Sequence, residues 1–303
     1  MSNTDLYKEQ ITKAINQFSQ KKFNEAEEIC LRILSENNNP DANHIVGCIR
    51  MSEGKFDESI SYITKSLDVN PEDIGALISL GCALSSKKDY KESIKVFKKI
   101  INLKNDISQV HFYLGEAYRQ VQKFEESLAA FKQCLSITPD HIGCQLMVGI
   151  IYEELKKFDQ AISFYKSCIE TYPDYVEPHI NLGMCLLLTG NYDEGWSEYE
   201  WRLKLPAEVY KLKFAKPKWI GQDLSNKKLL IVAEQSIGET FQYIRFAKHL
   251  AIEGAEITVM AQPETSKILE DQKWIKNVIS YEDAAEYDYY TYLLSIPKVL
   301  EWS

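Results

Sequence analysis

The sequence lacks several features that would place it in a particular class. No apolar run approaches the ~20 residues of a membrane span, and the best stretch, Met184 to Leu188, is far too short. The opening residues MSNTDLYKEQ have neither the basic nor the apolar part of a signal peptide. Basic residues are not in excess, because the net charge is −9. These absences argue against a membrane span, and against nucleic acid or an anionic membrane as the main partner.

The sequence also lacks a cysteine pair of the CxxC type, although it has seven cysteines. Cys48 and Cys82 are 34 residues apart, as are Cys134 and Cys168, so each pair repeats one helix position. Buried free thiols are therefore favoured over disulfides or metal ligands, and the expected compartment is the reducing cytoplasm. Four histidines have no carboxylate or cysteine at ligand spacing and are therefore interpreted as packing or surface residues: His44, His111, His141 and His179. We expect no metal and no cofactor.

What the chain does have is a repeat of 34 residues. Five glycines follow this period: Gly47, Gly81, Gly115, Gly149 and Gly183. An aromatic residue comes nine positions after each of them: Phe56, Tyr90, Phe124, Phe158 and Tyr192. A fixed period of this length, with two helical patterns in each unit, predicts an α-solenoid.

The residue types within one unit fit two crossing helices. Leu114, Tyr118 and Phe131 fall at helical spacing, which gives each helix one apolar face. Glycine and a small residue such as Ser127 stand where the helices cross closely, and Pro139 follows the second helix. One pair cannot bury its apolar face alone, so neighbouring pairs must stack.

About six such units are expected. The first, residues 5–38, is irregular and has Ala14 in place of the glycine, as is usual for a terminal repeat. The sixth begins with VEPHINLGMCLLLTG, which is apolar nearly all round and is predicted to be the junction with a second domain.

These units resemble the tetratricopeptide repeat (TPR) family over about two-thirds of the chain, although the family's tryptophan position holds other residues: Asn43, Leu77, His111, Gln145 and His179. The resemblance implies that the first helix of each unit lines a concave, peptide-binding groove. The groove residues would be His44, Ile78, Phe112, Glu116, Leu146, Ile150, Ile180 and Met184. Because this set is mostly apolar, it could bind a protein or peptide partner. Packing against another part of the same chain explains it equally well.

After residue 226 the pattern becomes α/β. KKLLIVAE, EITVMA, VISY and YDYYTYLLS are predicted strands, with helices between the first three. The alternation predicts a small, incomplete Rossmann-like lobe. The expected domains are a TPR solenoid at 1–205, a linker at 206–226 that packs on both neighbours, and the partial lobe at 227–303.

Loops at the carboxyl ends of parallel strands are where open sheets bind ligands, and here that loop is EQSIGETFQ. Gly238 stands alone, and Glu234 and Glu239 would repel phosphate, so a nucleotide site is not favoured. From composition alone, Glu239 is more simply a helix-terminus stabiliser than a catalytic residue.

Four segments resemble a bacterial architecture that joins TPR units to a glycosyltransferase domain related to the heptosyltransferases: Asn191–Arg202, Pro217–Leu224, Leu229–Leu250 and Tyr287–Pro297. The resemblance implies a catalytic role for Glu239, where the family commonly has aspartate. It also implies an acceptor loop that includes Gln235, Gly238, Gln242 and Arg245. Ser236 departs from the family's usual glycine.

Three functions follow from these observations, the third being an assembly factor that holds a client helix. The first is a protein-interaction scaffold that binds an apolar or amphipathic segment and carries a partial glycosyltransferase-like lobe. The second is the N-terminal part of a bacterial glycosyltransferase that moves sugar from a nucleotide sugar to a protein or surface saccharide. We expect the 303-residue chain alone to be inactive, because the donor lobe of such enzymes would follow Ser303. An incomplete sheet could also lead to self-association.

Overall fold

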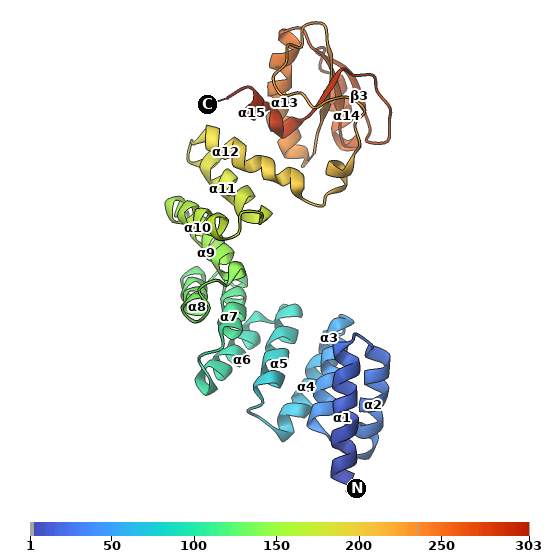
Figure 1. The fold of residues 1–303 in the computed structure, drawn as a ribbon, viewed down its shortest axis with the longest axis vertical. Coiled ribbons are helices and arrows are strands. Elements are labelled where there is room, and N and C mark those ends of the chain that lie inside the picture. The colour runs from blue at the N-terminus through green and yellow to red at the C-terminus, as the bar shows by residue number, and fades with distance from the viewer. Residues whose placement is uncertain (1–2, 235, 303) are drawn as a thin grey trace. The chain divides into compact units, whose positions relative to one another are not determined.

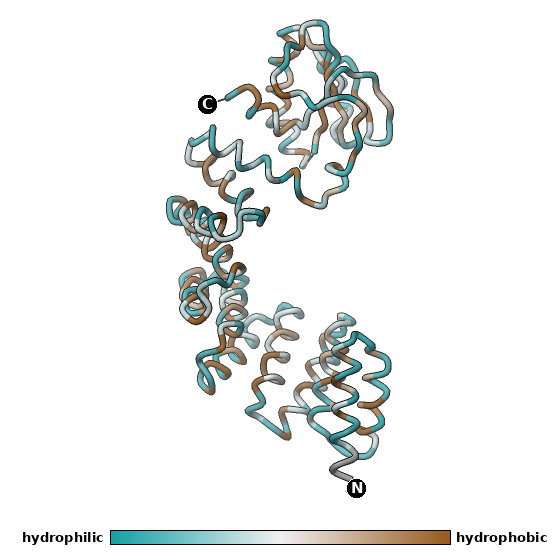
Figure 2. Tube along the Cα trace, viewed as in Figure 1, coloured by the Kyte–Doolittle hydropathy of each residue, from teal (hydrophilic) through white to brown (hydrophobic). Residues whose placement is uncertain are grey.

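The computed structural model describes residues 3–234 and 236–302. The chain divides into two compact units, Met1–Lys156 and Lys157–Ser303. Figure 1 shows the helices and strands along the chain. Hydrophobic and hydrophilic residues alternate along the helices of the repeats (Figure 2). Within the described residues, no helix is both long enough and apolar enough to cross a membrane.

The first unit is built from antiparallel helix pairs, with a further helix after the fourth pair. The helices are α1 (Asn3–Ser19), α2 (Phe23–Glu36), α3 (Pro40–Ser52), α4 (Phe56–Val69), α5 (Ile74–Ser86), α6 (Tyr90–Leu103), α7 (Ser108–Gln120), α8 (Phe124–Ile137) and α9 (Ile142–Glu154).

The turn inside each pair has one conformation that recurs with the repeat. Lys21, Gly54, Lys88 and Gln122 all have positive φ, two residues before the next helix begins. The amide of the following residue then bonds back across the turn, for example from Lys123 to the Tyr118 carbonyl at 3.0 Å. This left-handed closure satisfies carbonyls that a helix end leaves unpaired.

The recurring glycine is required by close helix crossing. A Cβ added to Gly115 would lie 2.7 Å from the ring of Phe131 on the partner helix. The Gly115 carbonyl also accepts a hydrogen bond from Ser127 Oγ at 2.8 Å, and Ser93 Oγ bonds to the Gly81 carbonyl at 2.9 Å. The small residues therefore allow close contact and also pair buried polar groups.

The polar residues at the family's tryptophan position also have a structural role. His111 Nε2 donates to the Asn105 carbonyl at 2.8 Å, and Gln145 Nε2 donates to the Pro139 carbonyl at 3.0 Å. These carbonyls belong to the turns between pairs. Polar side chains at this position thus satisfy the turn backbone.

The second unit joins three repeat helices to a small parallel sheet. Its elements are α10 (Phe158–Thr171), α11 (Val176–Leu188), α12 (Tyr192–Tyr199), η1 (Glu200–Lys204), η2 (Glu208–Lys211), β1 (Lys228–Val232), α13 (Ile237–Ile252), β2 (Glu256–Met260), α14 (Pro263–Glu270), β3 (Ile275–Ile279), β4 (Tyr289–Tyr292), η3 (Leu293–Ser295) and α15 (Ile296–Val299).

The four strands are parallel in the order β3-β2-β1-β4, which confirms the predicted parallel sheet. One face packs Leu229 and Ile231 against helix residues such as Phe246 and Leu250. The other face is covered partly by the irregular segment that includes Leu203 to Phe214. A doubly wound sheet has helices on both faces, whereas here an irregular segment covers part of one face.

The outer side of β4 is occupied by the chain itself. Trp219 N donates to the Tyr290 carbonyl at 2.7 Å, and Tyr290 N donates to the Pro217 carbonyl at 3.2 Å. The segment at 217–219 therefore continues the hydrogen bonding of the sheet beyond β4, and protects that edge from other chains.

Candidate functional site

The predicted groove positions of the first unit lie on α3, α5, α7 and α9, and part of their surface already contacts the next helix. His44 Nε2 lies 2.8 Å from Ser79 Oγ on α5. The Phe112 ring stacks on His141 at 5.1 Å between ring centroids. His44 and Phe112, both three positions before the glycine, thus help to join one first helix to the next.

The groove positions differ in how much surface remains for a partner. Ile78, Phe112 and Ile150 are half-buried, whereas Leu146 is only 7% exposed and belongs to the core. Glu116, also half-buried, pairs with Arg119 at 3.3 Å. The accessible part of this face is therefore mainly apolar.

In the second unit, the corresponding positions on α11 are covered. Ile180 and Met184 pack in one cluster with Trp196, Tyr199 and Leu294. The last of these belongs to the α/β part, so α11 packs its groove side within its own unit. This packing is what a helix that is apolar nearly all round requires.

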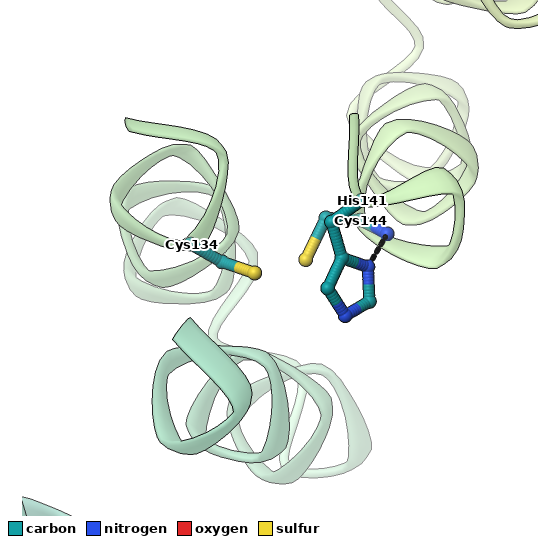
Figure 3. A group of neighbouring side chains, drawn as sticks. All are labelled: Cys134, His141 and Cys144. Atoms are coloured by element: carbon teal, nitrogen blue, oxygen red, sulfur yellow. Dashed lines mark hydrogen bonds between the residues drawn. The ribbon is translucent and has the colours of Figure 1, made fainter. Parts of the chain in front are cut away.

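Three side chains with metal-binding atoms meet at the join between α8 and α9. Cys134 Sγ, Cys144 Sγ and a ring nitrogen of His141 all lie within 4.8 Å of one another (Figure 3). His141 Nδ1 accepts a hydrogen bond from the Cys144 amide at 3.1 Å. The prediction that no repeat histidine has a cysteine at ligand spacing was therefore wrong for His141, because Cys144 follows it by one helical turn.

All seven cysteines are free thiols, and five of them are buried. Burial raises the pKa of Cys30 to about 12 and that of Cys168 to about 11. Such thiols stay protonated near neutral pH, as expected of small apolar core residues.

The predicted acceptor loop is mostly helical, because α13 begins at Ile237 and holds Gly238, Glu239, Gln242 and Arg245. Glu239 forms a capping box with Ser236: its carboxylate accepts from the Ser236 amide at 2.9 Å, and Ser236 Oγ accepts from the Glu239 amide at 3.3 Å. Gly238, Gln242 and Arg245 are exposed, and Gln235 lies outside the described residues. The contacts of Glu239 thus fit the role of helix-terminus stabiliser.

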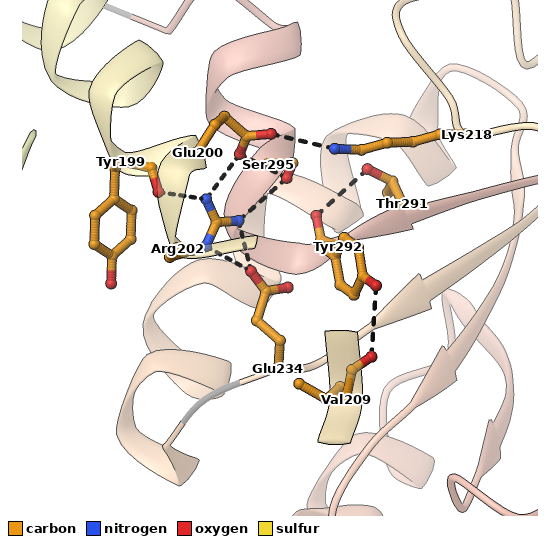
Figure 4. Close-up of polar contacts among 9 residues, drawn as sticks. All are labelled: Tyr199, Glu200, Arg202, Val209, Lys218, Glu234, Thr291, Tyr292 and Ser295. Carbon is orange, nitrogen blue, oxygen red and sulfur yellow. Dashed lines mark hydrogen bonds and ion pairs between the residues drawn. The ribbon is translucent and has the colours of Figure 1, made fainter. Parts of the chain in front are cut away.

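A buried ionic cluster, which the sequence did not predict, lies beside this loop (Figure 4). Arg202 from η1 is 1% exposed at its side chain and Glu234 is 0% exposed. Arg202 Nε and Nη2 both donate to Glu234 Oε1, at 2.9 and 2.5 Å, and Nη1 donates to Glu200 Oε1 at 2.8 Å. Nη2 also donates to Ser295 Oγ at 3.1 Å, and Lys218 pairs with Glu200 at 3.2 Å.

The two carboxylates of this cluster have opposite pKa shifts. Burial raises the pKa of Glu234 to about 7, although Arg202 opposes the shift. Burial acts on Glu200 too, but the charges of Arg202 and Lys218 outweigh it and keep its pKa below the ordinary value. The difference follows from the number of cations around each carboxylate.

The cluster also occupies a particular place in the sheet. Because the chain passes from β1 to β2 and β3 on one side and to β4 on the other, the topological switch point lies between β1 and β4. Glu234 follows β1 and Ser295 follows β4 closely. Ligands of open α/β sheets bind at this point, and here the guanidinium of Arg202 fills it.

Comparison with known proteins decides the class of the helical repeats. Family models described as tetratricopeptide repeat match residues 40–73, 74–107 and 106–174. The helix pairs of residues 40–174 are tetratricopeptide repeats. This confirms the predicted TPR repeats within residues 40–174. No curated protein matches the chain.

Several solved structures share part of the fold at low sequence identity. PilF of Pseudomonas aeruginosa is 14% identical, with a TM-score of 0.59, over 69% of this chain and 96% of its own. A tetratricopeptide repeat protein of Parabacteroides merdae is also 14% identical, with a TM-score of 0.59, over 67% of this chain and 82% of its own. MamA is 20% identical, with a TM-score of 0.50, over 52% of this chain and 93% of its own.

Proposed function

We propose that residues 1–156 are a protein-interaction scaffold, and that the face formed by the first helices of the repeats binds an apolar or amphipathic segment of a protein partner. The observation that carries the proposal is the half-buried apolar side chain repeated on consecutive first helices, at Ile78, Phe112 and Ile150. The free, buried thiols support a reducing compartment such as the cytoplasm.

The size of this surface limits the affinity. Burying a fully exposed Phe or Ile contributes about 1.5–3 kcal/mol, and these side chains, which are already mostly buried, have roughly a third of that or less left to give. Ordering the partner then costs further free energy. We therefore expect micromolar binding that depends weakly on salt, because apolar contacts are not screened by ions.

Replacing Phe112 with alanine should weaken such a complex by roughly threefold to fivefold, which corresponds to about 0.6–1 kcal/mol. Peptides selected from a displayed library on the wild-type protein can be labelled and titrated by fluorescence anisotropy. Ile78→Ala should have a similar effect. Leu103→Ala is the matched control, because Leu103 is 41% exposed on the second helix α6. Equal losses for Phe112→Ala and Leu103→Ala, or binding that salt abolishes, would reject the proposal.

The alternative is that the chain is the N-terminal part of a bacterial glycosyltransferase. It is favoured by the parallel sheet with a switch point between β1 and β4, together with the resemblance at Leu229–Leu250. Under this alternative Glu239 takes a proton from the acceptor hydroxyl, a role worth about 10²–10⁴-fold in rate.

Calorimetry with a panel of nucleotide sugars separates the two functions. The scaffold proposal expects no heat of binding at millimolar ligand, because Arg202 fills the switch point and the loop after β1 is acidic. If binding and transfer do occur, Glu239→Gln should lower turnover without loss of stability, since glutamine also completes a capping box. Saturable binding of any donor would favour the enzyme.

A further inference from the structure

Three ligand-bearing side chains converge where one helix ends and the next begins. Cys134 is in the last turn of α8, His141 is the N-cap of α9, and Cys144 is in the first turn of α9. Their ligand atoms lie within 4.8 Å of one another, and the two sulfur atoms point toward each other beside the imidazole (Figure 3). All three belong to the first unit.

The repeat shows that packing and capping do not require these residue types. One repeat earlier, the same three positions hold Ile100, Ile107 and Val110. In two earlier repeats the N-cap side chain accepts a hydrogen bond, and the residue is Asn39 or Asp73. Asparagine and aspartate are preferred capping residues, whereas histidine is not. One repeat later the thiol recurs as Cys168, but Tyr175 and Pro178 hold the other two positions. Among the described residues, two thiols and an imidazole of this kind therefore occur together only where they meet.

We propose that Cys134, His141 and Cys144 bind a thiophilic divalent metal ion, with Zn²⁺ the ion best suited to this ligand set. Two thiolates and one imidazole are three of the four ligands of a tetrahedral zinc site, and water takes the fourth position. Binding forms two metal–sulfur bonds and one metal–nitrogen bond, and releases the two thiol protons to solvent. The ion would tie the last turn of α8 to the first turn of α9.

Binding requires a small rearrangement. Zinc–sulfur bonds of about 2.3 Å and zinc–nitrogen bonds of about 2.0 Å place tetrahedral ligand atoms roughly 3.5–3.8 Å apart, so the cluster must contract by about 1 Å. His141 Nδ1 now accepts a hydrogen bond from the Cys144 amide, so the ring proton is on Nε2. Coordination of the metal through Nε2 requires this proton to move to Nδ1. The capping bond is then lost, which is a small cost beside the free energy of a structural zinc site.

Cobalt provides the test, because tetrahedral Co²⁺ bound to thiolate has an intense charge-transfer band. Titration of the reduced, metal-free full chain with Co²⁺ should give this band with a stoichiometry of one ion per chain, and Zn²⁺ should then remove it. Cys134→Ala and Cys144→Ala should abolish the band. His141→Asn should weaken binding at least tenfold while keeping the helix capped. Cys168→Ala, which removes the buried thiol one repeat after Cys134, should leave the band unchanged.

The unfolding temperature adds a readout that does not depend on cobalt. Zn²⁺ should raise it in the wild type and in Cys168→Ala, but much less in His141→Asn. Circular dichroism shows whether each variant is folded. Absence of the band in the reduced wild type in excess Co²⁺ would overturn the proposal. So would a band that survives in the folded Cys134→Ala and Cys144→Ala variants.

Discussion

Replacing Arg202 with alanine is expected to lower the free energy of unfolding of residues 157–303 by about 3–5 kcal/mol. The guanidinium is buried and bonds to both Glu200 and Glu234. Its removal leaves two acidic groups in an apolar setting without their main counter-charge. Arg202→Lys should recover only part of the loss, because one ammonium cannot reproduce the several directed bonds of the guanidinium.

Tryptophan fluorescence reports this unfolding separately, because all five tryptophans lie in the second unit: Trp196, Trp201, Trp219, Trp274 and Trp302. Denaturant titration of the variant should therefore shift the fluorescence midpoint strongly. Arg245→Ala is the control, since Arg245 is exposed on α13 and should change stability by no more than about 0.5 kcal/mol. Similar midpoints for Arg202→Ala and Arg245→Ala would show that the buried cluster does not hold this unit together.

Glu234→Gln should change how the stability of the same unit depends on pH. The pKa of Glu234 is raised from 4.5 to about 7. Between pH 4.5 and pH 7, the folded protein therefore keeps a proton on Glu234 that the unfolded chain has lost. The resulting stabilisation is complete below about pH 4.5 and is lost as the pH rises to about 7. It amounts to about 3 kcal/mol, and the glutamine variant lacks it because an amide does not titrate.

The measurement is the fluorescence-detected free energy of unfolding at several pH values between 4.5 and 7. The curve of Glu234→Gln should rise relative to the wild type as the pH increases. Ser295→Ala serves as control: it removes a hydrogen bond of the same cluster without removing a titrating group, so its curve should stay parallel to the wild type. A parallel curve for Glu234→Gln would contradict the raised pKa.

Local pattern was enough to predict most of the fold. The 34-residue spacing of glycine and aromatic residues located the helix pairs, because each pair repeats the same crossing and the same turn. The first strand was expected at 227–234 and lies at Lys228–Val232, since its side chains are apolar on both faces. β3 was placed too late, at 278–281, because the exposed Lys276 and Asn277 interrupt its apolar pattern.

Long-range contacts were beyond such patterns. Arg202 meets Glu234 across 32 residues and Ser295 across 93, and no periodicity connects these positions. The second helix of the sixth pair is also short, because α12 ends at Tyr199 and the chain goes on as η1, which carries Arg202. The cluster at His141 is different, because the spacing to Cys144 was visible in the sequence and only the approach of Cys134 required the fold.

The scaffold proposal is tested most directly by hydrogen–deuterium exchange of the full chain, measured with and without a peptide selected from the displayed library. The proposal predicts slower exchange in the first helices α5, α7 and α9, centred on Ile78, Phe112 and Ile150, with no change in the second helices α4, α6 and α8. Protection confined to the second helices, or to the α/β part at 228–299, would contradict it.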